Sequence, residues 1–448
     1  MQNVLSRKMV LVTATVFIFS SLAINVNAKI SSESQECVKC HSVVMPGLVK
    51  QWQASAHWQA GVGCYECHGA QKGDTDAMDH NGFLVSSIVS PKDCGKCHPK
   101  EVAEQEASHH AQAGDILNTK DGLLGQTVGG EPVVAVGCRQ CHGSIVKTNP
   151  DGTLDPSTWP NTGIGRINPD GSKGSCSACH TRHRFSKAQA RRPETCGKCH
   201  LGPDHPQKEI YEESKHGILY RAFKDKLNID NPKWVAGEDY FDAPTCATCH
   251  MSAAADLPVT HDVGTRLSWN LRAPVSTRTK NWEKKLASMN DVCGACHGVE
   301  FVNGFYKQLD DLVDLYNTKF AIPAKDIRSL LMKKGVISKG NFDDAIDWTY
   351  FELWHHEGRR ARHGAAMSGP DYAWWRGIYE VAKNFYSKFL PEVKEACDKA
   401  GQPKLYDEII AKYIDSDPRH SWFTQGFDPK KLQEIKKYYK DRYNQKVE

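Results

Sequence analysis

The sequence predicts a mostly α-helical protein in two parts: a motif-rich region over residues 29–300 and a region of long helices over residues 301–448. Three observations lead to this prediction. Eight copies of Cys-x-x-Cys-His lie between Cys37 and His297, and none follows. After Gly298 the apolar residues recur at the spacing of helix faces. Strand-like alternation of apolar and polar residues is nearly absent.

Each copy of the motif supplies two thiols and one imidazole at a fixed spacing. This spacing is the attachment signature of a c-type haem, in which the thiols add to the haem vinyl groups and the histidine binds the iron. A zinc site would need two cysteine pairs or later histidines, and a redox Cys-x-x-Cys would not recur eight times. The sequence therefore predicts eight covalently bound haems c. In order, the motifs comprise Cys37, Cys40 and His41; Cys64, Cys67 and His68; Cys94, Cys97 and His98; Cys138, Cys141 and His142; Cys176, Cys179 and His180; Cys196, Cys199 and His200; Cys246, Cys249 and His250; and Cys293, Cys296 and His297.

The haems themselves are expected to form the core of the first region. Only about 33 residues of chain are available for each haem, too few to bury a conventional side-chain core. Short helices and Gly/Pro-rich loops such as residues 161–174 would wrap the porphyrins. Sixteen of the seventeen cysteines belong to the motifs. The remaining one, Cys397, is expected to be a free thiol that packs in the helical region.

The region after residue 300 is expected to be all-α, with long helices packed antiparallel. Such an element can serve subunit association, and a helical hairpin that only caps the haem domain is the alternative. The segments with helical spacing are residues 305–320, 324–334, 342–362, 374–399 and 429–444.

The N-terminus predicts export. Arg7 and Lys8 precede the apolar run Met9–Ile24, and Val26-Asn27-Ala28 offers a small-residue cleavage site. This pattern is typical of a secretory signal peptide over residues 1–28, with an uncleaved anchor as the alternative. No other apolar stretch approaches about 18 residues, so no transmembrane segment is expected in the mature chain. We expect the periplasm or an equivalent extracytoplasmic compartment, where haem c is attached.

The formal net charge of +4 does not indicate a nucleic-acid partner. Loss of Arg7 and Lys8 with the signal peptide and addition of eight haems, each with two propionates, bring the net charge to about −6. Clusters of Lys and Arg interleaved with aromatic residues are also missing from the sequence. A role in nucleic-acid binding is therefore not expected.

Twelve of the twenty histidines lie outside the motifs and are candidates for the second axial position of an iron. A haem used only for electron transfer takes two strong axial ligands, whereas a catalytic haem keeps one position open. We expect seven distal ligands, which would leave one iron open, although enough histidines remain to fill the eighth place. The expected ligands are His57, His80, His183, His216, His261 and His363, together with one of the adjacent pair His109 and His110.

Two segments outside the haem motifs resemble the hydroxylamine oxidoreductase (HAO) family of octahaem cytochromes c, which includes hydrazine-oxidising relatives. They are GPDHPQKEIYEESKHG at residues 202–217 and GRRARHGAAMSGPDYAWWRG at residues 358–377. The resemblance extends over essentially the whole mature chain. Octahaem and pentahaem nitrite reductases use a lysine at the catalytic haem, and no Cys-x-x-Cys-Lys occurs here.

The resemblance implies roles for individual residues. The fourth haem, held by Cys138, Cys141 and His142, would be the active one, and the other seven would be bis-histidine. Asp204 and His205 would line its distal pocket. Tyr372 of a neighbouring subunit in a homotrimer would be covalently bonded to that haem, with Tyr379 as a competing candidate.

The chemistry of hydroxylamine oxidation is compatible with these roles, because a histidine beside a carboxylate can accept the released protons. The bland alternatives are that Asp204-His205, between prolines, forms only a turn and that Tyr372 only packs beside Trp374 and Trp375.

We therefore expect an enzyme that oxidises hydroxylamine to nitric oxide or nitrite and passes electrons to an acceptor c-type cytochrome. The alternatives are hydrazine oxidation to dinitrogen, reduction of nitrite or nitric oxide, and an electron-transfer wire in which all eight irons are doubly ligated.

Overall fold

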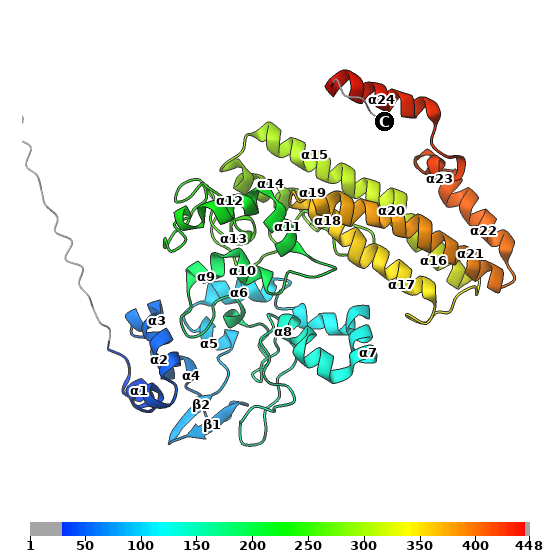
Figure 1. The fold of residues 1–448 in the computed structure, drawn as a ribbon. Coiled ribbons are helices and arrows are strands. Elements are labelled where there is room, and N and C mark those ends of the chain that lie inside the picture. Colours follow the sequence, from blue (N-terminus) through cyan, green and yellow to red (C-terminus); the bar gives the residue numbers. More distant parts are fainter. Residues whose placement is uncertain (1–28, 444–448) are drawn as a thin grey trace, which may run out of the picture.

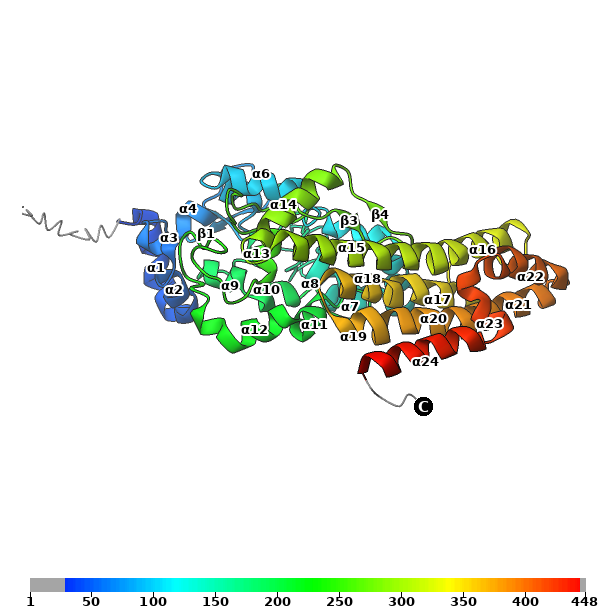
Figure 2. The same ribbon diagram turned by 90° about the horizontal axis from the view of Figure 1, so that it is seen from above.

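The computed structural model describes residues 29–443, apart from the side chains of residues 116–118, 121 and 443, so the predicted signal peptide over residues 1–28 lies outside it. The protein is mostly helical, as predicted. Short helices and loops make up the motif-bearing part, and long helices run side by side in the C-terminal part (Figure 1). Seen from above, the molecule is elongated, with the N-terminal helices at one end and the tips of the long helices at the other (Figure 2).

The N-terminal lobe carries motifs one and two and is held together through the buried side chain of Ser34. The Ser34 hydroxyl donates to Glu66 at 2.9 Å and accepts from the backbone N–H of Tyr65 at 2.9 Å. These two bonds join the first helix to the helix of motif two. The lobe contains α1 (Ser32–Val44), α2 (Pro46–Gln53), α3 (Ala56–Gln59), α4 (Cys64–His68) and an antiparallel hairpin of β1 (Ala77–His80) and β2 (Phe83–Ser86).

Most motifs coincide with about one turn of helix. Residues three apart share a helix face, so the two thiols of a motif point to the same side. At motif seven, the Thr248 hydroxyl accepts from the backbone N–H of Thr245 at 2.9 Å and closes a capping box. Motifs two, four and seven coincide with α4, α8 (Cys138–His142) and α13 (Cys246–His250), and motifs three, five, six and eight begin in α5 (Pro91–Gly95), η2 (Cys176–Ala178), α10 (Pro193–Gly197) and α14 (Trp282–Gly294).

The other elements of this part connect the motif turns, and the longest of them is interrupted. Its backbone leaves the helical conformation at Gly130, whose φ is 63°, two residues before Pro132. These elements are α6 (Pro99–Ala107), η1 (Ala113–Asn118), α7 (Lys120–Val136), α9 (Lys187–Arg191), α11 (Gln207–Glu213), α12 (Lys215–Phe223), η3 (Lys224–Lys226), β3 (Trp269–Asn270) and β4 (Thr277–Arg278).

The C-terminal part consists of long helices, as predicted. Several π-helical segments continue the α-helices on either side, so that the expected helices over 305–320 and 324–334 form one rod from α15 to α16. The elements are α15 (Val299–Tyr316), η4 (Asn317–Ala321), α16 (Ile322–Lys333), α17 (Ala345–Phe351), η5 (Glu352–Glu357), α18 (Gly358–Ala366), α19 (Pro370–Ala373), η6 (Trp374–Tyr379), α20 (Glu380–Asn384), η7 (Phe385–Phe389), α21 (Leu390–Lys399), α22 (Pro403–Ile410), η8 (Ala411–Asp415), η9 (Pro418–His420), α23 (Ser421–Gln425) and α24 (Pro429–Tyr443).

These helices share one apolar core, which runs from Tyr316 to Ile414. Cys397 is fully buried in it, which agrees with the expectation of a packing thiol. The fully buried Arg362 joins this core to the motif-bearing part, because its Nη1 donates to the carbonyl of Ala273 at 2.8 Å and to the Ser276 hydroxyl at 2.6 Å. The hydrogen bonds of this buried arginine therefore connect the C-terminal helices to the motif-bearing part.

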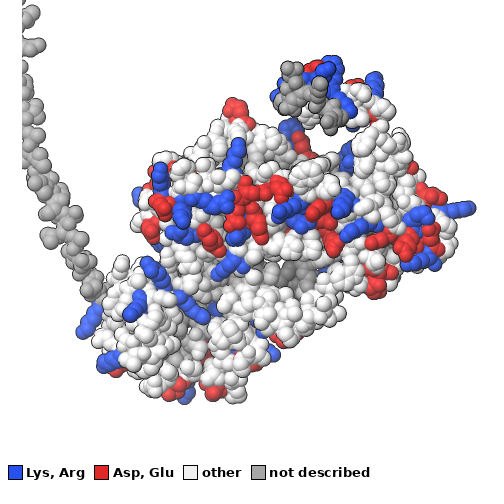
Figure 3. Space-filling model, viewed as in Figure 1, with Lys and Arg blue, Asp and Glu red and all other residues white. Residues whose placement is uncertain are grey.

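The surface carries charges of both signs. On the face seen in Figure 3, acidic and basic side chains are interspersed along the helical part, with no continuous basic stripe on that face. No helix within residues 29–443 is both long enough and apolar enough to cross a membrane.

The core can be tested with a buried leucine. Leu390→Ala should lower the free energy of unfolding by about 2–5 kcal/mol, because the removed side chain is fully buried and leaves a cavity. Leu432→Ala on α24, where the side chain is 42% exposed, serves as the control and should change it by less than about 0.5 kcal/mol. Denaturant unfolding of the two holoproteins measures both values, and equal effects would contradict the assigned core.

Candidate active site

A continuous, mainly apolar cavity of about 3130 Å³ runs through the motif-bearing part. Its wall carries cysteines and histidines of motifs three to eight, together with Cys67 of motif two. Every cysteine is a free thiol, so the motif cysteines are available for thioether bonds to haem. The cavity and the thiols therefore fit a chain of covalently attached haems.

Six motif histidines face a second imidazole across a gap of the size that an iron needs. When two imidazole nitrogens each lie about 2 Å from one metal ion, the ring centres are roughly 6 Å apart. The observed separations between ring centres are 6.1 Å for His41–His80, 6.4 Å for His68–His183, 6.2 Å for His98–His57, 6.4 Å for His180–His261, 6.2 Å for His200–His110 and 6.1 Å for His297–His216.

These pairs include six of the seven expected distal positions, and they contain His110 rather than His109. His110 faces His200, whereas His109 lies beside Gly264. His363 is buried on α18, where burial and the neighbouring Arg362 and Arg359 lower its pKa to about 3. Among the described residues His363 forms no ring pair with a motif histidine. Ligation by His363 stays a prediction.

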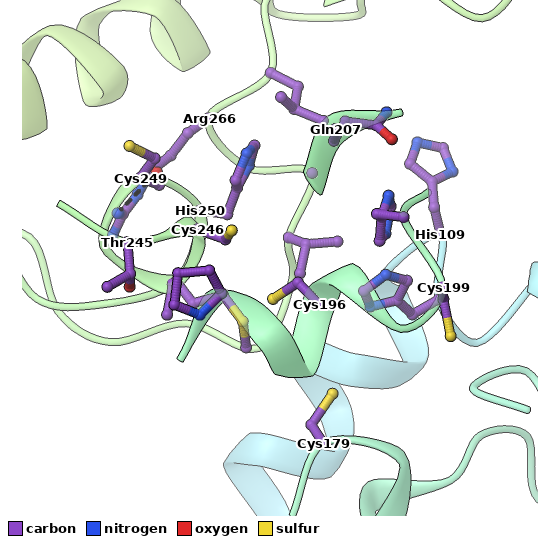
Figure 4. A pocket seen from close by; sticks show the side chains of 18 of the residues that line it. His109, Cys179, Cys196, Cys199, Gln207, Thr245, Cys246, Cys249, His250 and Arg266 are labelled. Carbon is purple, nitrogen blue, oxygen red and sulfur yellow. Dashed lines mark hydrogen bonds between the residues drawn. The ribbon is translucent and has the colours of Figure 1, made fainter. Parts of the chain in front are cut away.

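The motif thiols also show which motifs are neighbours. Thiols that lie close enough for one to shift the pKa of the other are Cys37 and Cys64, Cys67 and Cys94, Cys94 and Cys176, Cys179 and Cys196, Cys196 and Cys246, and Cys249 and Cys293. The motifs therefore follow one another in space as one, two, three, five, six, seven and eight. The Cys141 thiol of motif four meets Cys199 of motif six, so motif four branches from the row at motif six. Figure 4 shows Cys196 and Cys199 of motif six with Cys179 of motif five and Cys246 and Cys249 of motif seven.

Asp204 and His205 lie where motifs six and four meet, with the His205 ring centre 6.1 Å from that of His200 in motif six. The neighbouring Cys199 thiol and the charge of His205 both lower the pKa of the Cys141 thiol in motif four. His205 Nδ1 lies 2.6 Å from Asp204 Oδ1 at a poor angle for a hydrogen bond, so the contact acts mainly through charge. His205 Nε2 lies 3.0 Å from the carbonyl oxygen of Cys199. Both ring nitrogens therefore face oxygen acceptors, which favours the doubly protonated, charged imidazole.

The C-terminal helices contribute two further side chains to this cluster. Arg359 on α18 donates to Asp204 Oδ2 at 3.1 Å and to His355 Nε2 at 2.9 Å. The buried His355 on η5 stacks on Phe351, with 4.2 Å between ring centres. Neither residue is among the site residues expected from the sequence. Arg359 lies inside one of the family-like segments, but nothing in the local pattern connects it or His355 to Asp204.

The charges of the cluster support one another. Burial alone would raise the pKa of Asp204, but His205, His355 and Arg359 outweigh it and hold the pKa of that carboxyl well below its usual range. Burial would likewise lower the pKa of His205, but the Asp204 carboxylate outweighs it and raises that pKa. The site therefore combines one carboxylate and one guanidinium with two imidazoles, of which His205 has a raised pKa.

Tyr372 is buried inside its own chain. Its side chain is 7% exposed, and its hydroxyl accepts a hydrogen bond from Arg376 Nη1 at 3.1 Å. Trp374, Trp375 and Tyr379 are 51%, 57% and 43% exposed and form an aromatic surface patch next to it. Of the two tyrosines considered for a haem cross-link, Tyr379 is the one on the surface.

Comparison with known proteins gives matches in sequence to multihaem cytochromes. A family model described as "Seven times multi-haem cytochrome CxxCH" matches residues 168–342, and one for cytochrome c554 and c-prime matches residues 17–69. A probable nitrite reductase–hydroxylamine oxidoreductase fusion protein of Kuenenia stuttgartiensis is 31% identical over 263 residues, 50% of this chain and 26% of that protein. The C-type polyheme cytochrome OmcC of Geobacter sulfurreducens is 25% identical over 285 residues, 60% of this chain and 26% of that protein. The matched part thus spans about a quarter of the length of each relative.

Two solved structures share the fold. One, described as a hypothetical multiheme protein, has a TM-score of 0.74 and 25% identity and covers 89% of this chain and 100% of that chain. The other, a reducing HAO-like protein complex of Kuenenia stuttgartiensis, has a TM-score of 0.62 and 20% identity and covers 83% and 87%.

The repeated motif, the paired imidazoles and these matches define the chain as a multihaem c-type cytochrome. Within this class it resembles hydroxylamine oxidoreductase-like proteins, in sequence over half of the chain and in fold over most of it. The resemblance inferred from residues 202–217 and 358–377 is thereby confirmed.

The assignment of His110 can be tested by exposing an iron. His110→Ala should create one additional haem per chain that binds carbon monoxide, because the His200 haem would lose its second axial ligand. His109→Ala is the matched control and should leave the number of carbon monoxide-binding haems unchanged. Titration of the reduced holoproteins with carbon monoxide, followed by absorption spectroscopy, gives the count. A new site in His109→Ala alone would reverse the assignment.

Proposed function

We propose that this cytochrome is a redox enzyme that reduces nitrite, with hydroxylamine as a related substrate, at the haem held by Cys138, Cys141 and His142. The observation that carries the proposal is the composition of the cluster beside that motif. Arg359 is cationic, His205 has a raised pKa, His355 is close by, and Asp204 is the one carboxylate among them.

This cluster suits reduction better than oxidation. Reduction of nitrite consumes protons, whereas oxidation of hydroxylamine releases them. His205, held against Asp204 and the Cys199 carbonyl, is set to donate a proton rather than to accept one. Nitrite is an anion at neutral pH and hydroxylamine is not, so the positive charges of Arg359 and His205 favour nitrite.

Arg359, His205 and Asp204 would each have a separate role in this reaction. Arg359 would hold the anion near motif four, and its bonds to Asp204 and to the Arg272 carbonyl fix its orientation. His205 would supply a proton, and Asp204 would stabilise the charged imidazole before transfer. Haem groups at the motifs supply the transfer of single electrons. Motif four adjoins motif six, so a single electron transfer would connect the reacting haem to the chain of the other haems.

The relatives support this direction. The curated Kuenenia relative is described as a nitrite reductase–hydroxylamine oxidoreductase fusion, and the Kuenenia complex as reducing. We further propose eight haems, bis-histidine ligation of the seven outside motif four, export by the signal peptide over residues 1–28 to the periplasm or an equivalent compartment, and a c-type cytochrome as the redox partner.

A second candidate is oxidation of hydroxylamine to nitric oxide or nitrite, or of hydrazine to dinitrogen, in a homotrimer. The exposed patch of Trp374, Trp375 and Tyr379 beside Tyr372 favours it, because a second copy could be received there. In that reaction Asp204 and His205 would accept protons, and electrons would leave to an acceptor cytochrome.

The role of Arg359 separates the substrates. Arg359→Gln should raise the KM for nitrite about tenfold or more, because a charge-assisted hydrogen bond contributes about 1.5–3 kcal/mol, and should leave the KM for hydroxylamine nearly unchanged. Arg360→Gln is the control, since Arg360 pairs with Glu380. Steady-state turnover with a reduced dye for nitrite and an oxidised acceptor for hydroxylamine measures both. A wild-type protein that oxidises hydroxylamine and does not turn over nitrite would overturn the proposal in favour of the second candidate.

The state of Tyr372 provides an independent test of direction. We expect Tyr372 to be unmodified, because its hydroxyl is bound by Arg376 of the same chain. Mass spectrometry of a protease digest of the holoprotein would show the Tyr372 peptide either free or joined to the Cys138–Cys141 haem peptide. A joined peptide that disappears in Tyr372→Phe would support the oxidative candidate, and a joined peptide that persists would move the link to Tyr379.

A further inference from the structure

α24 stands off from the other C-terminal helices at the edge of the molecule (Figure 1). Each side chain that the structure describes on it, over residues 429–442, is exposed, apart from the half-buried Lys436. A helix of this length is marginally stable in water unless it packs one face against something else. The described part of the chain leaves nearly every side of α24 open, so this helix is available to an outside partner.

The apolar side chains of α24 form one stripe along the helix. Leu432 and Ile435 are three residues apart, and Tyr438 and Tyr439 follow Ile435 by three and four, so all four share one face. They are between 42% and 55% exposed, and Phe427 just before the helix is 75% exposed. The two tyrosines combine apolar rings with hydroxyls that need a polar partner or water. A stripe of this composition fits a boundary between an apolar layer and water.

Two basic side chains lie within the stripe. Lys431 precedes Ile435 by four residues, and Arg442 follows Tyr438 by four, so both share its face. The Arg442 guanidinium lies over the Tyr438 ring, 5.9 Å from the ring centre. The apolar stripe is therefore accompanied by positive charge.

The two acidic residues of α24 lie outside the stripe and are balanced there. Glu434 and Asp441 each have a lysine four residues before them, Lys430 and Lys437, and Lys437 forms an ion pair with Asp441. Six basic and two acidic residues give the helix a net charge of +4. The stripe itself carries only positive charge.

We propose that α24 lies along the surface of a bilayer that contains anionic phospholipids, with Leu432, Ile435 and Tyr439 buried at the boundary between headgroups and acyl chains. Lys431 and Arg442 keep their aliphatic stems beside the apolar layer and reach the phosphates with their charged ends. A basic amphipathic helix with aromatic residues on its apolar face is typical of such binding. No described helix can cross a membrane, and none is needed, because such a helix lies in the plane of the interface. The inference does not depend on the nitrogen compound that reacts at motif four.

A second copy of the chain is the competing occupant of this face. In a symmetric dimer the same surface of both copies meets itself, so α24 against α24 would bring the basic residues of two stripes together. Like charges that meet across an interface oppose association. A bilayer with anionic headgroups instead carries the opposite charge over its whole surface. The charge of the stripe therefore favours the bilayer.

Sedimentation of the holoprotein with vesicles measures the proposed binding, using phosphatidylcholine alone and phosphatidylcholine with one-third phosphatidylglycerol. The wild type should prefer the anionic vesicles. Lys431→Gln together with Arg442→Gln should weaken binding to them about tenfold or more, because each basic residue at an anionic surface contributes about fivefold. Lys430→Gln together with Lys437→Gln is the matched control on the other side of the helix and should weaken it less than about threefold, because the attraction falls off with distance.

The apolar part of the stripe is tested without a change in charge. Leu432→Gln together with Ile435→Gln should weaken binding to the anionic vesicles about tenfold or more, because two apolar side chains no longer leave water. Analytical ultracentrifugation without lipid gives the mass of the wild type and of this variant, and the two masses should be equal.

Equal affinity of the wild type for the two kinds of vesicle would overturn the proposal. Equal weakening by the two pairs of charge substitutions would also overturn it, because the attraction would then come from the overall charge. A lower mass for the variant with Leu432→Gln and Ile435→Gln would assign α24 to a contact between copies and overturn it as well. Failure of nitrite turnover in the wild type leaves these outcomes unaffected.

Discussion

The covalent bond between each haem and its two cysteines is the interaction on which the motif-bearing part depends. Before Ala188 the described residues contribute isolated buried apolar side chains, such as Trp52 and Ile88, that join no apolar cluster. A chain of this kind cannot offset the entropy of folding by burying its own side chains. The haems must supply the buried surface, and the one-turn helices and paired imidazoles are the geometry that their attachment requires.

The C-terminal helices are stabilised by packing of their own apolar side chains, and this packing helps to position the reacting centre. They have a conventional apolar core from Tyr316 to Ile414. From that core Arg362 reaches the segment 273–276, and Arg359 and His355 reach Asp204. The segment that carries Asp204 leads into α11, whose Tyr211 packs in a second apolar cluster with Trp234 and Tyr240, so the site is held from both sides. The π-helical turn η5, which carries His355, is the local adjustment that a regular helix would not provide.

The sequence was informative where the determinants are local. The Cys-x-x-Cys-His motif, the helix periodicity and the contexts of His57, His80, His183, His216 and His261 each depend on residues close in the chain, and the structure pairs all five histidines with a motif histidine. The choice of His110 over His109 depends on how α6 ends against motif six, which no neighbouring residue encodes. His355 and Arg359 lie more than 150 residues from Asp204 in sequence. Their contact is made by tertiary packing, and one sequence carries no sign of it.

The direction of the reaction is another property that the haem motifs leave open, since oxidation and reduction use the same electrons and the same iron. The side chains beside the reacting haem favour one direction over the other. In an oxidative site the histidine beside the iron must be able to take up a proton, so a neutral imidazole with a nitrogen facing the substrate is required. In this chain the Asp204 carboxylate and the Cys199 carbonyl occupy the two sides of His205 as acceptors, and Arg359 adds a positive charge. The raised pKa of His205 increases the fraction of this imidazole that is protonated, which agrees with its proposed role as the proton donor in nitrite reduction. The burial of Tyr372 within its own chain, where Arg376 binds its hydroxyl, agrees with the proposed reductive direction.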